Sequence, residues 1–309
     1  MKIIKNTLDF ALENPTAVTI GKFDGVHLGH RKLLGEILNK RPGLQSCVFT
    51  FDPAPAVLFG LSDGKELTTR EEKRLLFERL GVDVLIEFPL TRESAAIEPE
   101  DFVRGILADR LKARFIAAGE DLSFGNHGAG DAALLRRMGE SLGFETDIIE
   151  KIWLDGAEIS STRVREAVEK SDMPLAARLL GAPYTVLGEI VHGNHIGSSL
   201  GFPTINLLPG PTKLLPGNGV YFSRVRIGDR TFRGITNVGC KPTVEDRRVM
   251  GVETYLYDFD GDLYGQQAAV ELYEFSRPEQ RFASLQDLRR QLQQDIRNGA
   301  AYWSDRVEA

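Results

Sequence analysis

The chain has 309 residues, of which 42% are hydrophobic and 27% are charged, and its formal net charge at pH 7 is -6. This composition is typical of a globular protein of roughly two domains and excludes a disordered or fibrous chain. The negative net charge provides no overall positive field for a nucleic-acid backbone or an anionic membrane, so we expect neither as a partner.

The N-terminal residues and the two cysteines indicate the compartment. Asp9 and Glu13 interrupt the stretch in which a signal peptide needs an apolar core, and no later run approaches the roughly 18 apolar residues of a membrane helix. Cys47 and Cys240 are far apart and offer no metal-ligand spacing. We therefore expect a cytoplasmic protein with both cysteines buried, and the oligomeric state stays open.

From residue 17 to about residue 181, short apolar runs alternate with stretches of helical periodicity. Strands are predicted at 17–23, 46–51, 82–88, 114–120 and 145–154, and helices at 30–40, 71–81, 99–112, 131–143 and 161–181. This alternation is typical of a parallel α/β sheet with crossover helices.

After Gly181 the pattern changes to short strands separated by Gly, Pro and Thr. The clearest strands are predicted at 219–227, 230–238, 252–259 and 267–275, with two-residue hairpin turns at Gly228-Asp229 and Asp260-Gly261. We therefore predict a small six-stranded β-barrel.

A terminal helix should follow Ser284 as its N-cap and place Leu285, Leu288, Leu292 and Ile296 on one stripe against the barrel. The predicted domains are residues 1–182 and 183–309.

The string VTIGKFDGVHLGH joins a predicted strand to a predicted helix. Its glycines let backbone N–H groups and a helix N-terminus approach a phosphate. His27 and His30 lie on the first turn, and both can donate hydrogen bonds to phosphate oxygens during phosphoryl or nucleotidyl transfer. Alone, the string is equally compatible with two surface histidines beside an ordinary turn.

A second string, ISSTRVR at residues 159–165, opens another predicted helix. Ser160, Ser161 and Thr162 can cap the helix or bind phosphate, and Arg165 can reach the outer phosphates. Helix capping alone would account for one of these hydroxyl residues. It would not account for the presence of both strings, VTIGKFDGVHLGH and ISSTRVR, in one α/β domain.

Together the two strings resemble the H-x-G-H nucleotidyltransferase superfamily, and GKFDGVHLGH with ISSTRVR resembles its FAD synthetase branch. The resemblance implies a Rossmann-like domain in which the FMN phosphate attacks the α-phosphorus of ATP in line, with Mg²⁺, to give FAD and pyrophosphate. It implies ATP contacts from Gly21, Phe23, Asp24, Gly25, His27, His30, Ser160, Ser161, Thr162 and Arg165, with His27, His30 and Arg165 catalytic.

The segment GEDLSFGNHGAGD at residues 119–131 is similar to a flavin-side loop of that family. The similarity implies FMN contacts from Asp121, Phe124 and Gly125. Leu122 and Ser123 depart from the usual wording of the loop, and Ala54 stands where relatives commonly have His or Gln. Loss of a polar side chain beside phosphate would slow adenylylation, so these departures bear on the rate of that reaction more than on its existence.

In the second half, VLGEIVHGNHIGSSLGFPTINL leads through glycines 193, 197 and 201 into Pro203-Thr204-Ile205-Asn206. The glycines would let the backbone approach a polyphosphate, although most glycine-rich loops are simply turns. Thr204 and Asn206 are two apart on an extended segment, so their side chains point the same way. Hydroxyl and amide oxygens suit Mg²⁺ bound to ATP phosphates.

Carboxylates cluster in VETYLYDFDGDLYG. Asp258, Asp260 and Asp262 do not form an EF-hand, because glycine is at loop position 4 instead of 6 and Ala269 is at position 12, so we interpret them as a solvated turn. Glu253 stands among apolar and aromatic strand residues, where a carboxylate needs a partner or a function.

These blocks resemble the riboflavin kinase domain, whose PTAN signature is PTIN here. The resemblance implies that Glu253 is the general base that accepts a proton from the terminal ribityl hydroxyl of riboflavin, giving FMN and ADP. It also implies ATP and Mg²⁺ contacts from Gly193, Gly197, Gly201, Pro203, Thr204 and Asn206, the last two as metal ligands, and riboflavin contacts from Arg277 and Phe282. Over residues 15 to 300 the chain is identified as a member of the family of bifunctional prokaryotic riboflavin kinases/FMN adenylyltransferases.

Two alternatives stay open. A monofunctional kinase would fit Ala54 and the altered loop at residues 119–125, although the intact histidine pair opposes it. A flavin-binding regulator without turnover would show damage at Glu253 or Thr204, or an added DNA-binding helix pair, and the sequence has neither.

Overall fold

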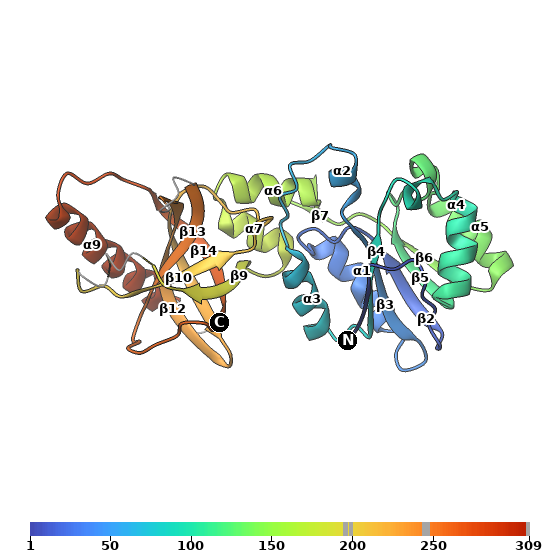
Figure 1. Ribbon diagram of the computed structural model, residues 1–309, viewed down its shortest axis with the longest axis horizontal. Helices are drawn as coiled ribbons and strands as arrows, with labels where there is room; N and C mark the ends of the chain where they lie inside the picture. The colour runs from blue at the N-terminus through green and yellow to red at the C-terminus, as the bar shows by residue number, and fades with distance from the viewer. Residues whose placement is uncertain (194–196, 198–199, 243–247, 307–309) are drawn as a thin grey trace. The chain divides into compact units, whose positions relative to one another are not determined.

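The computed structural model describes residues 1–193, 197, 200–242 and 248–306, without the side chains of residues 240–242 and 248–250. Its contacts divide the chain into two compact units, Met1–Ser161 and Thr162–Ala309. Figure 1 shows a sheet with helices in the first unit and a barrel in the second. The division falls at the start of helix α6 (Ser161–Glu169). The domain boundary after residue 182 stays a prediction.

The first unit is built on six parallel strands in the order β1-β4-β3-β2-β5-β6, which confirms the predicted α/β class. The strands are β1 (Lys2–Lys5), β2 (Thr16–Ile20), β3 (Gln45–Asp52), β4 (Val84–Pro89), β5 (Ala113–Gly119) and β6 (Glu145–Ile149). The chain passes from β2 to β3 and β4 on one side and returns to β5 and β6 on the other. In such sheets ligands bind outside the carboxyl ends of the strands at this reversal, so the loops after β2 and β5 border the expected site.

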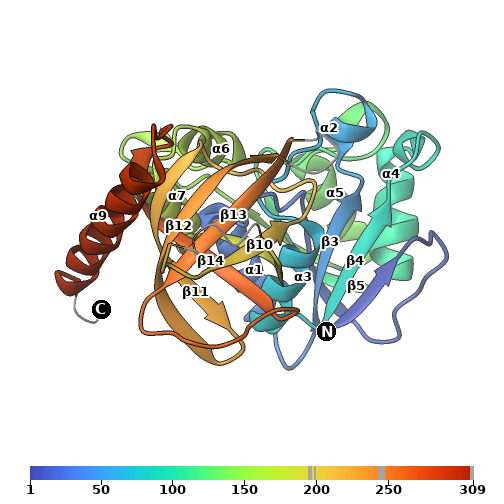
Figure 2. The same cartoon turned by 60° about the vertical axis from the view of Figure 1, so that its left-hand side comes forward.

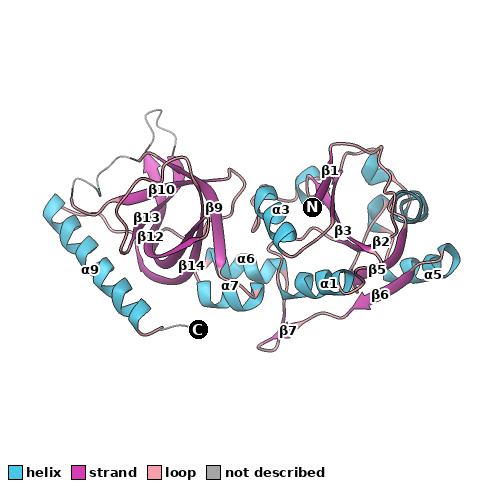
Figure 3. Ribbon diagram, turned by 90° about the horizontal axis from the view of Figure 1, so that it is seen from below, coloured by secondary structure: helices cyan, strands magenta, loops and turns pink. Residues whose placement is uncertain are grey.

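Helices cover both faces of this sheet (Figure 3). One face is covered by α1 (Leu28–Leu38) and α3 (Arg70–Arg79), and the other by the π-helix η2 (Phe102–Arg110) and α5 (Ala132–Leu142). Because every residue of β2 is buried, its side chains alternate between two cores. Ala17 packs with the α1 side, and Val18 and Ile20 pack with the η2 side.

Short elements complete the first unit. They are η1 (Ser94–Ala96), η3 (Asn126–Gly128), α2 (Pro55–Leu58), α4 (Pro99–Asp101) and the hairpin β7 (Trp153–Leu154) with β8 (Ala157–Glu158).

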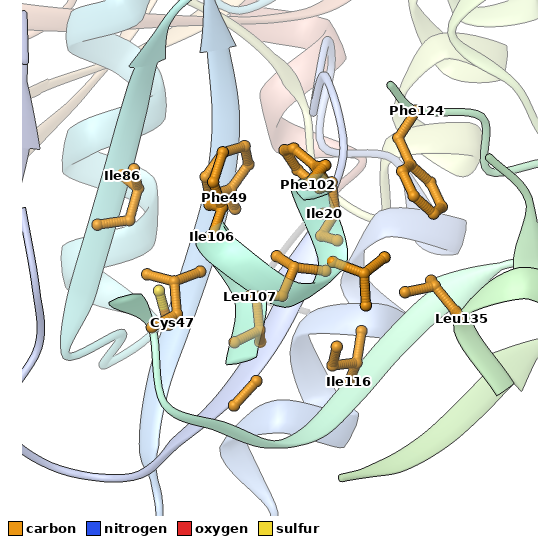
Figure 4. Close-up of a cluster of buried hydrophobic side chains, with 14 of the residues drawn as sticks. Ile20, Cys47, Phe49, Ile86, Phe102, Ile106, Leu107, Ile116, Phe124 and Leu135 are labelled. Carbon is orange, nitrogen blue, oxygen red and sulfur yellow. The ribbon is translucent and has the colours of Figure 1, made fainter. Parts of the chain in front are cut away.

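Figure 4 shows the core on the η2 side, where Cys47 lies among aromatic and aliphatic side chains. Cys47 is fully buried, as predicted, and burial raises the pKa of its thiol. The side chain of Cys240 lies outside the described residues.

Two details of the first unit differ from the sequence predictions. Strand β1 was not predicted, because only Ile3 and Ile4 stand between its lysines and it forms an edge of the sheet. The helix predicted at 99–112 winds as a π-helix from Phe102, and the N–H of Leu111 donates to the carbonyl of Ile106.

The second unit is a closed antiparallel barrel in the order β10-β13-β12-β11-β14-β9, which confirms the predicted six-stranded barrel (Figure 2). Its elements are α6, α7 (Met173–Leu180), β9 (Tyr184–Val191), β10 (Thr204–Pro209), β11 (Gly219–Ile227), β12 (Arg230–Pro242), β13 (Arg248–Leu256), β14 (Gln267–Pro278) and α9 (Leu285–Ser304).

Of the two predicted hairpin turns, one is confirmed and one is wrong. Ile227 pairs with Arg230 across Gly228-Asp229, with Gly228 at a φ of 57°. Asp260-Gly261 does not close a hairpin, because β13 pairs with β10 and β12 whereas β14 pairs with β11 and β9. Residues 257–266 therefore connect strands that are not neighbours.

Helix α9 starts as predicted, since the Ser284 side chain accepts a hydrogen bond from the N–H of Asp287. The predicted stripe is wrong at its start, because Leu285 is 67% exposed. The buried face runs through Asp295, Gly299 and Trp303, and Trp303 packs with barrel residues. Among the described residues, no helix combines the length and apolarity needed to cross a bilayer.

Candidate active sites

The loop after β2 has an unusual backbone. Phe23 and Val26 adopt positive φ angles of 50° and 45°, and Gly25 adopts 86°. Residues with a Cβ, and β-branched ones above all, rarely occupy this region, and such strain concentrates at functional sites. Packing holds it here, because the buried Phe23 ring lies 5.0 Å from that of His30 and 5.6 Å from that of Phe77.

His27 and His30 lie together at the start of α1. His27 is the N-cap residue, and its ring stacks on that of His30 with 3.8 Å between centroids. The Nδ1 atoms of both rings are buried and have no hydrogen-bond partner among the residues that the structure describes. Buried polar atoms are normally paired, so two unpaired ones at a helix N-terminus are consistent with a site for a polar ligand.

Both rings are neutral at pH 7. Burial lowers the pKa of His27 to about 4, against the carboxylates of Asp121 and Glu158, which raise it. Burial, then the neighbouring His27 and Lys73, lowers the pKa of His30 well below 6.5. Each ring can therefore donate one hydrogen bond without carrying charge, and an anion bound beside it would raise its pKa.

These pKa shifts predict acid sensitivity of the fold. Unfolded histidine titrates near 6.5, so between about pH 6.5 and 4 the unfolded chain binds protons that native His27 does not. The contribution of each such histidine to the free energy of unfolding is therefore fully present above pH 6.5. Below that pH it falls by about 1.4 kcal/mol per pH unit. We expect urea midpoints at pH 7, 6 and 5, followed by circular dichroism, to fall less steeply in His27→Gln/His30→Gln than in the unchanged chain. Equal slopes would contradict the assignment.

The loop after β2 is tied to two other segments through Asp24. The Asp24 carbonyl accepts a hydrogen bond from Ser161 Oγ at 2.7 Å, and its carboxylate accepts bonds from the N–H groups of Leu67 and Thr68 at 2.7 and 3.3 Å. The structure thus joins the two predicted ATP-binding strings at Asp24 and Ser161. Thr162 and Arg165 follow Ser161 on α6.

Asp121, in the loop after β5, and Glu158, after β6, bring carboxylates near the histidine pair. The carboxylate of Asp121, 68% exposed, lies 3.7 Å from Nζ of Lys151, which also pairs with Glu158 at 2.9 Å. Asp121 and Glu158 both act on the pKa of His27. Lys151 and Glu158 were not predicted as site residues, because their only sequence signal is a position within eight residues before ISSTRVR.

Phe124 and Gly125 have structural roles in the same loop. Phe124 is 3% exposed, and its ring lies 5.5 Å from that of Phe102 in the core (Figure 4). Gly125 has a φ of 71°, and an added Cβ would come within 2.8 Å of Pro99. Their FMN contacts stay a prediction. Ala54 is the N-cap of α2 and makes no side-chain capping bond there.

In the barrel, register brings the predicted kinase residues together. Asn206 on β10 pairs with Glu253 on β13, and Thr204 Oγ donates a hydrogen bond of 2.6 Å to Oε1 of Glu253. Val252 and Thr254, on either side of Glu253, are fully buried, whereas Glu253 is half-buried. Since side chains alternate between the faces of a strand, this group lies on the outer face of the barrel.

The three predicted glycines each meet a local requirement. A Cβ at Gly193 would overlap the side-chain amide of Asn206, and one at Gly197 would lie 2.5 Å from the carbonyl oxygen of Phe202 and 3.4 Å from Thr204 Oγ. Gly201 has a φ of 89°. The glycines at 193 and 197 therefore lie against the two predicted metal ligands. Pro203 is exposed just before β10.

The side chain of Arg277 binds helix α9. Its guanidinium donates two hydrogen bonds, of 2.8 and 2.6 Å, to the carboxylate of Asp295, which is 2% exposed. Such a bidentate pair fixes the helix on the barrel. Phe282 is half-buried in the segment before α9. Riboflavin contacts from Arg277 and Phe282 stay predictions.

Comparison with known proteins assigns a family to each part. The FAD synthetase family matches residues 9–163, and the riboflavin kinase family matches residues 180–303. A bifunctional riboflavin kinase/FMN adenylyltransferase from Escherichia coli (strain K12) is 36% identical over 301 residues, 96% of each chain. One from Listeria monocytogenes is 33% identical over 291 residues, 93% of this chain and 92% of that one.

A solved structure is similar over the whole chain. It is a crystal structure named as a macrolide-efflux protein from Streptococcus pneumoniae, with a TM-score of 0.84 and 28% identity over 96% of this chain and 97% of that one. The similarity supports the arrangement of elements in both units.

Proposed function

Since the chain belongs to the family of bifunctional riboflavin kinases/FMN adenylyltransferases and catalyses both ATP-dependent steps from riboflavin to FAD, we propose which residues serve each step. The pair His27/His30 serves FMN adenylylation, and Glu253 serves riboflavin phosphorylation. We assign adenylylation to a domain of residues 1–182 and phosphorylation to residues 183–309.

Phosphorylation uses Glu253 as general base. The observation that carries this assignment is the 2.6 Å hydrogen bond from Thr204 Oγ to Glu253, which orients the carboxylate beside Asn206. The carboxylate takes the proton of the terminal ribityl hydroxyl while that oxygen bonds to the γ-phosphorus, and the bond to the leaving ADP breaks. Positioning of the two substrates supplies most of the remaining acceleration.

Thr204 and Asn206 are the proposed ligands of the Mg²⁺ that accompanies ATP. A hydroxyl that donates its hydrogen to Glu253 still has lone pairs on Oγ, and Asn206 is 7% exposed and lies against Gly193. This oxygen donor set fits Mg²⁺. When bound, the ion neutralises charge on the ATP phosphates and orients them. The backbone of Gly193, Gly197, Gly201 and Pro203 is the proposed border of the same nucleotide.

Adenylylation uses the loop after β2 and the start of α1. The two neutral rings of His27 and His30 donate hydrogen bonds to ATP phosphates, and Arg165 supplies a positive charge. Gly21, Phe23, Asp24, Gly25, Ser160, Ser161 and Thr162 are the other proposed ATP-binding residues, and Asp121, Phe124 and Gly125 are proposed for FMN. The FMN phosphate attacks the α-phosphorus and pyrophosphate leaves, so no covalent enzyme intermediate is required.

The purified chain, incubated with ATP, Mg²⁺ and riboflavin, is expected to form FMN and then FAD, separated by chromatography. With FMN supplied in place of riboflavin, FAD and pyrophosphate should form. FMN formation from riboflavin without FAD formation from FMN would instead favour the monofunctional kinase.

A further inference from the structure

A row of polar side chains crosses the outer face of the barrel at Glu253. Register places Asn206 of β10 and Asn237 of β12 opposite Glu253, one on each side. Directly opposed residues in antiparallel strands have Cβ atoms about 4.5–5.5 Å apart. The proposed nucleotide site accounts for Asn206, whereas Asn237 has no role so far.

Glu279, just after β14, fixes the amide of Asn237. Nδ2 of Asn237 donates to Oε1 of Glu279 at 3.4 Å, and Nδ2 of Asn218 donates to Oε2 at 3.1 Å. An ionised carboxylate only accepts hydrogen bonds, so the NH₂ group of Asn237 must face Glu279. The carbonyl oxygen of Asn237 is therefore presented away from Glu279, as an acceptor.

Two glycines leave the surface beside this row without side chains. Gly239 lies two residues after Asn237 and Gly251 two residues before Glu253, and the two glycines pair directly. They therefore share the face of Asn237 and Glu253. A Cβ at Gly239 would overlap Oε1 of Glu279, so the carboxylate reaches Asn237 only because this strand position is bare.

We propose that Asn237 positions riboflavin in the kinase site and that Glu279 orients Asn237 for this purpose. The proposal rests on the assignment of Glu253 as the base. The ribityl chain of riboflavin carries several hydroxyl groups, each able to donate a hydrogen bond. While the terminal hydroxyl gives its proton to Glu253, the Asn237 carbonyl accepts a bond from a neighbouring hydroxyl of the same chain and holds the reacting oxygen in place.

The test is a double-mutant cycle on riboflavin phosphorylation. Asn237→Ala should raise the KM for riboflavin about tenfold, the effect of roughly one well-placed hydrogen bond, and leave the KM for ATP unchanged. Glu279→Ala should raise it about threefold, on the same basis. Glu279→Gln should stay closer to the unchanged chain, because its carbonyl still accepts from Asn237. The double variant should be no worse than Asn237→Ala, since Glu279 acts through Asn237.

Gly239→Ala gives a second route to the same point, because the added methyl group displaces the Glu279 carboxylate and should reproduce Glu279→Ala. Glu274→Ala is the matched control, since Glu274 is a nearby carboxylate within β14 that also has a side-chain partner, Arg306 at 3.3 Å, and it should leave the KM for riboflavin unchanged. FAD formation from supplied FMN should be unchanged in every variant, because adenylylation is assigned to the other unit. An unchanged KM for ATP in riboflavin phosphorylation verifies that the barrel itself is folded.

Two results would overturn the proposal: effects of Asn237→Ala and Glu279→Ala that multiply in the double variant, or an unchanged KM for riboflavin in both single variants. A Glu253→Gln variant with full kcat would refute the base assignment alone, because the cycle is measured on the KM for riboflavin.

Discussion

Glu253→Gln is expected to lower kcat for riboflavin phosphorylation by about 10²–10⁴, the range of general-base catalysis, with a smaller change in KM. Glutamine keeps the size of the side chain, and its carbonyl oxygen can still accept the hydrogen bond from Thr204 Oγ. The strand pairing and the nucleotide contacts should therefore survive, and only the proton acceptor is lost. The measurement is steady-state formation of FMN from riboflavin.

The control is Glu189→Gln, the same change at an exposed position of β9, which should leave kcat unchanged. FAD formation from supplied FMN by Glu253→Gln should also be unchanged. If Glu253→Gln retains near-full kcat, Glu253 is a structural strand residue, and Asp258 and Asp262 are the next candidates for the base.

The parallel sheet was predictable because burial on both faces leaves a strong local signal. Strand β2 is apolar or small along its length, and α3 begins at a capping box in which Thr69 and Glu72 each bond the backbone of the other. Strand β1 lacks this signal, since it is short, lies at an edge and has lysine at both ends. Local composition therefore identified the central elements and missed the peripheral one.

The pairing of strands was less predictable than their existence. Asp-Gly favours a tight turn, yet the chain at Asp260-Gly261 crosses between strands that are separated in the barrel. Which strands become neighbours is determined by closure of the barrel, and closure depends on all six strands together. The same holds for α9, whose fully buried residues follow its contacts with the barrel, whereas the predicted stripe begins at the exposed Leu285.

The candidate sites show the same division. Glycine-rich strings with His27 or Thr204 are contiguous, so a resemblance could identify them. Asn237 lies within the string GITNVGCKPT, but only register shows that it faces Glu253. Lys151 is an ordinary residue in the sequence and becomes notable only through its ion pairs with Asp121 and Glu158. The spatial partner of a side chain on another strand cannot be read from a local string.

Replacing His27 or His30 by Ala is expected to lower the rate of FAD formation from FMN by about 10²–10³ for each lost transition-state donor, while FMN formation from riboflavin persists. The stacked rings, the unpaired buried Nδ1 atoms and the position at the N-terminus of α1 motivate this expectation. Because the rings are in contact, the double variant should lose less than the product of the single losses. The measurement is kcat for adenylylation and for phosphorylation on the same preparation.

Amide variants test whether the rings act as neutral donors, as their lowered pKa values indicate. Asn places an amide nitrogen near the position of Nδ1, and Gln places one near that of Nε2. One of the two should retain more adenylylation than Ala, because a neutral N–H group is restored without charge. His127→Asn is the control, since His127 is exposed in the loop after β5 at a φ of 53°, which Asn tolerates. Equal loss of both activities in His27→Ala would show that the ring supports the fold, and amide variants as inactive as Ala would show that the protonated ring is required.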